Sequence, residues 1–191
     1  MPHVFDPHNF KRLDNPERRK LLPASKILRE FGLRPGQTFV DIGAGLGFFA
    51  LPAKSIVGRH GVVVCVEHSR EMLKMLGTRA AQKRKSVELL ECSATATGLP
   101  NHIADIVLVA FVLHEVEDRS AVLHEVSRVL KPGGRLLLIE WKKNRPEKGP
   151  SVADRIAMHE TVHLLRTAGF RHVVARGYNP YHYIVRGDIA G

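Results

Sequence analysis

The chain has 191 residues, of which 44% are hydrophobic and 25% charged, as is usual for one globular domain. No apolar run reaches the length of about 18 residues that a membrane-spanning helix needs. The N-terminal MPHVFDPHNFKRL lacks the apolar core of a secretion signal, so we expect a cytoplasmic protein. Cys65 and Cys92 lie in or beside apolar runs, where we expect buried thiols and no structural disulfide.

The formal net charge of +10 has two interpretations. Excess cations attract nucleic acid, anionic lipid or an acidic substrate, but they also occur on an ordinary solvated surface. The basic clusters 11–20, 78–86 and 141–149 are diluted by acids or loop residues, and only 6% of the residues are aromatic. Because nucleic-acid-binding surfaces combine clustered cations with stacking aromatic rings, we favour the solvated surface and keep nucleic acid as an alternative.

Strand-like and helix-like segments alternate through the first two thirds of the chain. Helix 23–33 ends at a glycine and precedes a strand at 37–42; helix 46–58, kinked at Pro52, precedes a strand at 61–67. The continuous β-branched run of this second strand is typical of burial on both faces. The elements that follow are a serine-capped helix at 69–85, strands at 87–91 and 104–112, a helix at 118–130, and a strand at 135–141 after the turn KPGG.

This alternation favours an open parallel sheet with helices on both faces. The last third differs: a helix is expected over 153–170, and the runs 171–178 and 181–187, joined by Asn-Pro, predict a closing antiparallel strand pair. No repeat or linker interrupts the chain. We therefore expect a single domain over 1–191, with a core at 22–191 and an N-terminal lid or solvated tail at 1–21 that includes Arg18 and Arg19.

The stretch VDIGAGLGFFA (40–50) ends a strand in an acid and continues into a glycine-rich turn. In a doubly wound sheet, ligands bind beyond the carboxyl ends of the strands, where this turn lies. Phe48 occupies the third glycine position of the dinucleotide fingerprint, and the Asp41 carboxylate would face a pyrophosphate. Both features argue against a dinucleotide. Neither argues against S-adenosylmethionine, because that cofactor has no phosphate and carries an ammonium and a sulfonium group.

Two further features agree with that cofactor. Gly43 and Gly45 would let the backbone approach the methionyl group without a Cβ in the way. Glu67 ends the second strand and is placed to accept both ribose hydroxyls, although an ordinary strand-terminal charge is the alternative. The glycine turn and the acid together favour S-adenosylmethionine over a dinucleotide.

These motifs, with VVVCVEHS (62–69), ADIVLVAFVLHEVED (104–118) and VLKPGGRLLLIEW (129–141), resemble the class I S-adenosylmethionine-dependent methyltransferases. The similarity is to the small-molecule branch around the ubiquinone/menaquinone-biosynthesis C-methyltransferases, and it covers roughly residues 20–186. It implies an α/β fold with a Rossmann-like, seven-stranded, mostly parallel sheet of order 3-2-1-4-5-7-6. Strand seven is then antiparallel, and helices cover both faces.

The resemblance also implies S-adenosylmethionine as the cofactor and S-adenosylhomocysteine as its product. The cofactor-binding residues that it implies are Asp41, Gly43, Ala44, Gly45, Glu67, His68, Ser93, Ala94, Ala110 and Phe111. The acid that often contacts adenine is absent, since Cys92 or Ser93 stands in its place, and the Ala94 backbone is an alternative contact. Ala110, Phe111 and Leu113 are expected to line the transferred methyl and the methionyl amine.

The methyl acceptor is not identified by any motif. The sequence lacks [DN]PP[YFW] and a Pro-Cys or Thr-Cys nucleophile, and Cys65 lies inside a strand, which disfavours adenine, glutamine, cytosine and metalloid acceptors. We expect a small molecule, with RNA as the alternative. A nicotinamide-binding oxidoreductase and a non-catalytic cofactor-binding protein are the alternatives from other classes.

His114 lies where the acceptor should approach. It is either a general base or a histidine that bonds a neighbouring backbone group. The other expected pocket residues are Leu113, Trp141 and Tyr181, with plain packing favoured for Tyr181 and Tyr183.

The segment HETVH (159–163) matches the zinc motif H-E-x-x-H, in which His159 and His163 would bind zinc and Glu160 would activate water. With 11 histidines in the chain, a chance match is easy, and no third ligand follows at a metzincin-like spacing. We therefore expect surface or packed histidines and no metal.

Overall fold

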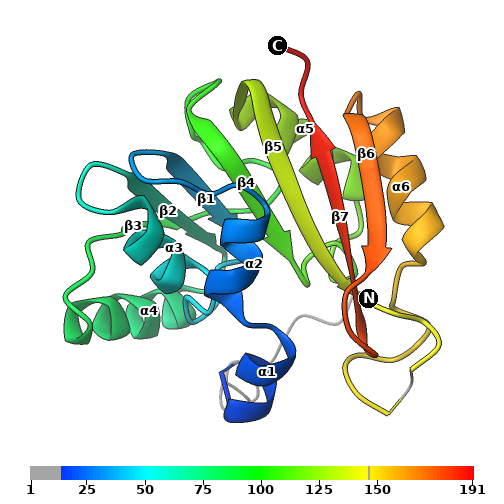
Figure 1. Cartoon of the computed structure of the whole chain (residues 1–191), viewed down its shortest axis with the longest axis horizontal. Coiled ribbons are helices and arrows are strands. Elements are labelled where there is room, and N and C mark those ends of the chain that lie inside the picture. Colours follow the sequence, from blue (N-terminus) through cyan, green and yellow to red (C-terminus); the bar gives the residue numbers. More distant parts are fainter. Residues whose placement is uncertain (1–13, 146) are drawn as a thin grey trace. The chain divides into compact units, whose positions relative to one another are not determined.

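The computed structural model describes residues 14–145 and 147–191, shown as coloured ribbon in Figure 1. The chain forms two compact units, one within residues 5–98 and one that contains residues 99–191. Across the chain, the strands are hydrogen-bonded in the order β3-β2-β1-β4-β5-β7-β6. The fold is therefore the expected Rossmann-like α/β fold. Within residues 14–145 and 147–191, no helix is both long and apolar enough to cross a membrane.

The first unit is built on the parallel strands β1 (Thr38–Ile42), β2 (Val62–Glu67) and β3 (Glu88–Glu91). In the register, Asp41 lies opposite Cys65, and Glu67 lies opposite Glu91. The helices of this unit are α1 (Pro16–Leu21), α2 (Ala24–Glu30), α3 (Ala50–Val57) and α4 (Arg70–Gln82). Ser69 caps α4 as predicted, by accepting a hydrogen bond from the Met72 backbone N–H.

Helix α3 begins at Ala50, and not at Leu46 as the pattern predicted. Residues 43–49 form turns because Gly43, Gly45 and Gly47 take φ values of 74°, 52° and 76°, in the left-handed region that glycine favours. Pro52 therefore lies in the first helical turn, where its missing N–H has no helical partner to lose. The predicted kink at Pro52 was wrong.

The second unit holds the parallel pair β4 (Ala104–Ala110) and β5 (Leu130–Trp141). The antiparallel strands β7 (His182–Asp188) and β6 (Arg171–Gly177) follow β5 in the sheet, as predicted. Its helices are α5 (Arg119–Val129) and α6 (Met158–Thr167).

Two boundaries in the second unit differ from the prediction. Strand β5 begins at Leu130, and the KPGG segment does not separate the helix from the strand as predicted. Leu130 pairs with Ala104 of β4 and Arg135 pairs with Ile106, so KPGG lies inside β5 at an irregularity of the pairing. Helix α6 begins at Met158, since the preceding segment is held in another conformation by the buried side chain of Arg155. In both places, tertiary hydrogen bonding overrides local periodicity.

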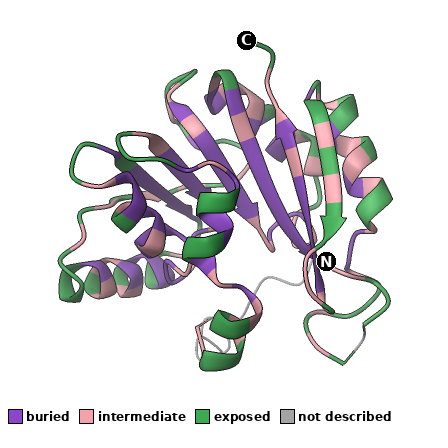
Figure 2. Cartoon of the chain, in the orientation of Figure 1, coloured by how far each residue is buried: buried purple, intermediate pink, exposed green. Residues whose placement is uncertain are grey.

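Figure 2 shows that burial is concentrated in the strands β1, β2, β4, β5 and β7, while β3 and β6 are largely exposed or half-buried. Cys65 on β2 is buried as expected, but Cys92 is only half-buried, and both are free thiols. Burial raises the pKa of the Cys65 thiol, so this group stays neutral.

Candidate cofactor and acceptor sites

Glu67, the last residue of β2, is fixed by the backbone of two turns. The Gly45 N–H donates to its Oε2 at 2.9 Å, and the Ser69 N–H donates to its Oε1 at 3.0 Å. The residue is only 4% exposed. The N–H groups of Gly43 and Ala44 both donate to the carbonyl of Val66, so the glycine turn is bound to the end of β2. The structure therefore brings the predicted glycine turn and the predicted acid together.

Asp41 is buried beside this turn and accepts a hydrogen bond from the Ala50 backbone. Burial raises the pKa of its carboxyl to about 8, and the negative charge of Glu67 adds to this effect. The cationic Arg18 acts in the opposite direction. A buried carboxyl of this kind favours a cation as its neighbour, since a positive charge stabilises the ionised form.

The described part of the predicted lid is residues 14–21, which include α1. The Arg18 guanidinium lies 4.6 Å from the centroid of the Phe48 ring, in a cation–π contact. Asp14 pairs with Arg19 at 2.7 Å and also with Arg79, whose Nη1 donates to the Leu46 carbonyl at 3.1 Å. These contacts join α1 to the glycine turn, while residues 1–13 of the predicted lid lie outside the described residues.

The remaining predicted cofactor residues of this unit are more exposed. His68 is 59% exposed, with Nδ1 3.0 Å from Glu67 Oε1. The Ser93 hydroxyl is engaged locally, 2.8 Å from Thr95 Oγ1 and 3.2 Å from the Thr95 N–H that donates to it. Ala94 is half-buried. The roles of these three residues stay predictions.

In the second unit, Phe111, Trp141, Tyr181 and His182 form an aromatic cluster. Ring centroids lie 5.4 Å apart for Phe111 and Trp141, 4.3 Å for Trp141 and His182, and 6.4 Å for Tyr181 and His182. Phe111 follows Ala110 at the end of β4 and takes a φ of 63°, which is unusual for a bulky residue. Such local strain is typical of functional sites.

Two side chains near this cluster are packed in the core. Leu113 has no exposed surface and packs in the core after the end of β4, and its place beside the methionyl end and the acceptor stays a prediction. Tyr183 is 1% exposed, and its hydroxyl donates to the Ile156 carbonyl at 3.0 Å and lies 2.7 Å from Thr161 Oγ1. Packing is therefore the correct interpretation for Tyr183.

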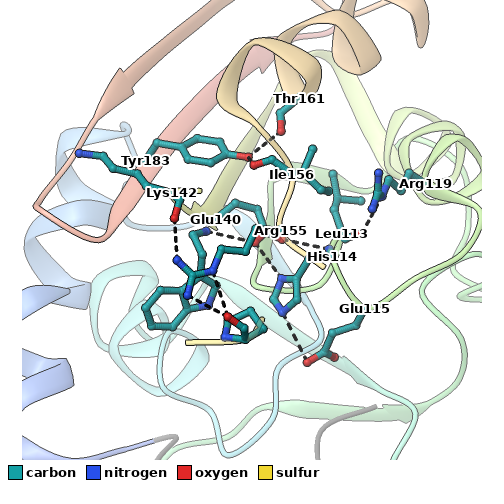
Figure 3. A network of polar contacts seen from close by, with 12 residues as sticks. Leu113, His114, Glu115, Arg119, Glu140, Lys142, Arg155, Ile156, Thr161 and Tyr183 are labelled. Atoms are coloured by element: carbon teal, nitrogen blue, oxygen red, sulfur yellow. Dashed lines mark hydrogen bonds and ion pairs between the residues drawn. The ribbon is translucent and has the colours of Figure 1, made fainter. Parts of the chain in front are cut away.

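His114 lies between two carboxylates, as Figure 3 shows. Its Nδ1 is 2.8 Å from Glu140 Oε2, and its Nε2 is 3.8 Å from Glu115 Oε1. Burial lowers the pKa of the imidazole, but the charges of both glutamates and the Glu140 hydrogen bond outweigh burial and raise it. The sequence suggested a backbone partner or a base, and missed Glu140. The available signal was an acid inside the apolar run LLLIEW.

Arg155, also missed from the sequence, organises the segment after β5 (Figure 3). It is 1% exposed, and its guanidinium donates to the Lys142 carbonyl at 2.7 Å. It also donates to the carbonyls of Arg145 at 2.6 Å and Pro150 at 2.8 Å, and to that of Lys148. The guanidinium carbon lies 5.7 Å from the Trp141 ring. Arg155 therefore links this segment to the aromatic cluster.

The HETVH segment lies in α6 but does not gather metal ligands. His159 and His163 are exposed, and Glu160 pairs with Arg119 at 3.2 Å. In the described part of the chain, no group of three or more His, Cys, Asp or Glu side chains is placed to hold a metal ion.

Residues 40–138, more than half of the chain, match the model of the methyltransferase domain family. The chain belongs to this family. Over 118 residues it is 36% identical to the ubiquinone/menaquinone biosynthesis C-methyltransferase UbiE of Shewanella sp. (strain W3-18-1), covering 61% of this chain and 47% of that protein. The chain thus spans about half the length of the curated relatives that it matches.

Solved structures agree with this family. A SAM dependent methyltransferase from Aquifex aeolicus is 32% identical, with a TM-score of 0.92, and the match covers 98% of this chain and all of that one. The [4+2]-cyclase SpnF is 17% identical, with a TM-score of 0.76 and coverage of 89% and 80%. The second likeness shows the fold alone, and the fold does not determine the chemistry.

Proposed function

We propose that this methyltransferase-domain chain transfers a methyl group from S-adenosylmethionine to a small molecule and releases S-adenosylhomocysteine. The observation that carries the proposal is the buried Glu67 carboxylate, bound by the Gly45 N–H at the end of β2. A carboxylate has about four acceptor positions, so two backbone donors leave capacity for ribose hydroxyls. The left-handed glycine turn and the buried Asp41 fit the cationic methionyl end.

The comparisons support the same activity. The Shewanella relative is a C-methyltransferase, and the Aquifex aeolicus structure is of a SAM dependent methyltransferase. The matched part of the Shewanella protein includes less than half of its length, so its quinone-related substrate is not transferred to this chain. A cytoplasmic location and one domain over 1–191 remain predictions from the sequence.

When bound, the cofactor supplies a methyl carbon made electrophilic by sulfonium. In the proposed mechanism, Glu67 holds the ribose, Asp41 faces the ammonium, and Gly43, Ala44 and Gly45 surround the methionyl group. His68, Ser93, Ala94, Ala110 and Phe111 are the further proposed cofactor contacts. Alignment of donor and acceptor accounts for much of the rate enhancement of such a transfer.

On the acceptor side, Trp141 and Tyr181 are proposed as walls of the acceptor site. His114 is proposed as the general base for an acceptor that must lose a proton. The described part of the 1–21 segment is proposed to act with the cofactor site, because α1 contacts the glycine turn through Arg18.

The proposal is tested with methyl-labelled S-adenosylmethionine and fractionated cell extract. We expect label in the small-molecule fraction with the wild-type chain, and strongly reduced label with Glu67→Ala at the same cofactor concentration. Label in RNA alone would contradict the acceptor class. Cofactor binding without transfer to any fraction would instead identify a non-catalytic cofactor-binding protein.

A further inference from the structure

Glu140 is an acid that directly follows the buried apolar residues 136–139 of β5. The residue has no exposed surface, and it lies in β5 opposite Tyr183 of β7. A buried carboxylate costs several kcal/mol unless hydrogen bonds and an opposite charge offset its desolvation. Its presence therefore requires specific partners nearby.

Those partners come mainly from one residue. Glu140 Oε1 accepts the His114 backbone N–H at 3.3 Å, and Oε2 lies 2.8 Å from His114 Nδ1. Oε2 also accepts the Trp141 N–H at 3.3 Å. Glu140 thus holds the backbone of His114 through the N–H and its ring through Nδ1, and the two bonds together favour one orientation of the ring.

The opposite ring nitrogen faces a different environment. With Nδ1 on Glu140, Nε2 is directed toward Glu115, whose side chain is 26% exposed, at 3.8 Å (Figure 3). The preceding residue is also fixed, because Arg119 Nε donates to the Leu113 carbonyl at 3.1 Å. The His114 side chain is 7% exposed, and its Nε2 side faces this partly exposed carboxylate.

The charged groups around the ring come from three neighbouring segments. Glu140 on β5, Glu115 after β4 and Asp154 before α6 all favour the imidazolium form. The nearby cations are engaged elsewhere: Arg119 pairs with Glu160, and Arg155 binds backbone carbonyls. Glu140 thus contributes to both the orientation and the proton affinity of His114, and Glu115 and Asp154 add to the proton affinity.

We propose that Glu140 is the positioning residue of His114: it holds Nδ1–H and leaves the Nε2 lone pair to take a proton from the methyl acceptor. This inference rests on the proposed function. In the step, the acceptor X–H bond breaks as the X–methyl bond forms, and the proton moves to Nε2. The electron pair of the broken carbon–sulfur bond stays on sulfur, so atoms and charges balance.

The test compares Glu140→Gln with Glu115→Gln in the full chain. In Glu140→Gln, the amide oxygen can replace Oε2 and accept from the ring Nδ1–H and the Trp141 N–H, whereas the NH2 group in place of Oε1 cannot accept the His114 N–H. A thermal melt shows whether this variant folds. The 15N NMR shifts of His114, followed through a pH titration without substrate, give its tautomer and pKa. We expect Glu140→Gln to lower the pKa and mix the tautomers, whereas Glu115→Gln lowers the pKa and keeps the Nδ1–H tautomer.

Turnover provides the second measurement. We expect Glu140→Gln to reduce kcat at least about tenfold, to shift its acidic limb to lower pH, and to leave KM little changed. An unchanged tautomer and titration in Glu140→Gln, or an altered tautomer with an unchanged kcat profile, would overturn the inference. If the amide variant does not fold, Glu140→Asp serves, because it keeps the charge and shortens the reach; normal kcat in that variant would contradict positioning.

Failure of the proposed function gives a different pattern. In that case no variant and no wild-type chain transfers methyl, whatever the NMR titration of His114 shows. If the titration then matches the expectation, the hydrogen-bonded pair is real, but its role in methyl transfer is refuted.

Discussion

The Gly45 N–H donates a 2.9 Å hydrogen bond to Glu67 Oε2, and this bond joins the glycine turn to the end of β2. The two halves of the proposed cofactor site are therefore a single hydrogen-bonded unit. A change in either residue should disturb the other, because the turn holds the carboxylate and the carboxylate holds the turn.

Removal of the Glu67 carboxylate should weaken S-adenosylhomocysteine binding strongly. Hydrogen bonds to a charged group contribute about 1.5–3 kcal/mol each, so Glu67→Ala should raise Kd at least about tenfold. Calorimetry measures this change. Glu91→Ala is the matched control, since Glu91 ends the adjacent strand β3 with a 42% exposed side chain. Equal losses in both variants would contradict the assignment of Glu67.

A side chain at Gly45 should impair both folding and binding. Gly45 has a φ of 52°, and a residue with Cβ in the left-handed region costs about 1–2 kcal/mol. Gly36→Ala is the control for this strain, because Gly36 has a φ of 82° and open space around its Cβ position. We expect similar losses of Tm, but weaker S-adenosylhomocysteine binding only in Gly45→Ala. Unaltered affinity in Gly45→Ala would be evidence against close backbone approach to the cofactor.

Sequence periodicity was sufficient to predict the buried strands β2 and β4, because the continuous runs 63–66 and 106–109 match strands buried on both faces. It failed at the starts of α3 and α6, where left-handed glycines and the Arg155 hydrogen bonds decide the backbone. Local patterns contain no information about such distant contacts.

The limits of local patterns also decide which residues of the candidate site could be predicted. Glu67 and the glycine turn follow a known arrangement at strand ends, so they were predicted. The partner of His114, in contrast, is 26 residues away on another strand, and no spacing rule connects the two. The complete burial of Leu113 was not predictable either, because position after a strand does not tell which side chain turns into the core.

The raised pKa of Asp41 predicts how stability depends on pH. Its folded-state pKa of about 8 exceeds the ordinary value of 3.8, so between these values the folded chain holds a proton that the unfolded chain has lost. The free energy of unfolding should therefore fall as pH rises from about 4 to 8 by this contribution. Asp41→Asn keeps an acceptor and removes the titration. Urea unfolding at several pH values should show that the free energy of unfolding depends less on pH in Asp41→Asn than in the wild type. The same pH dependence in both would refute the raised pKa of Asp41.

Loss of the hydrogen bonds from the Arg155 guanidinium to four backbone carbonyls should loosen the segment 142–150 after β5. Arg155→Lys keeps the charge but cannot reach four carbonyls at once, and each hydrogen bond to a charged group that is lost costs up to about 1.5–3 kcal/mol. We expect a lower Tm and an altered emission from Trp141, the single tryptophan of the chain. Arg166→Lys, at an exposed position of α6, should change neither. The same Trp141 spectrum in wild type and Arg155→Lys would show that the Arg155 guanidinium does not position the aromatic cluster around Trp141.

We propose that the glycine turn and Glu67 bind S-adenosylmethionine and not a nicotinamide dinucleotide. Calorimetric titration of the wild-type chain with S-adenosylhomocysteine, followed by a titration with NADH, tests it most directly. We predict saturable 1:1 binding of S-adenosylhomocysteine and no heat of binding for NADH. Binding of NADH without binding of S-adenosylhomocysteine would contradict the account.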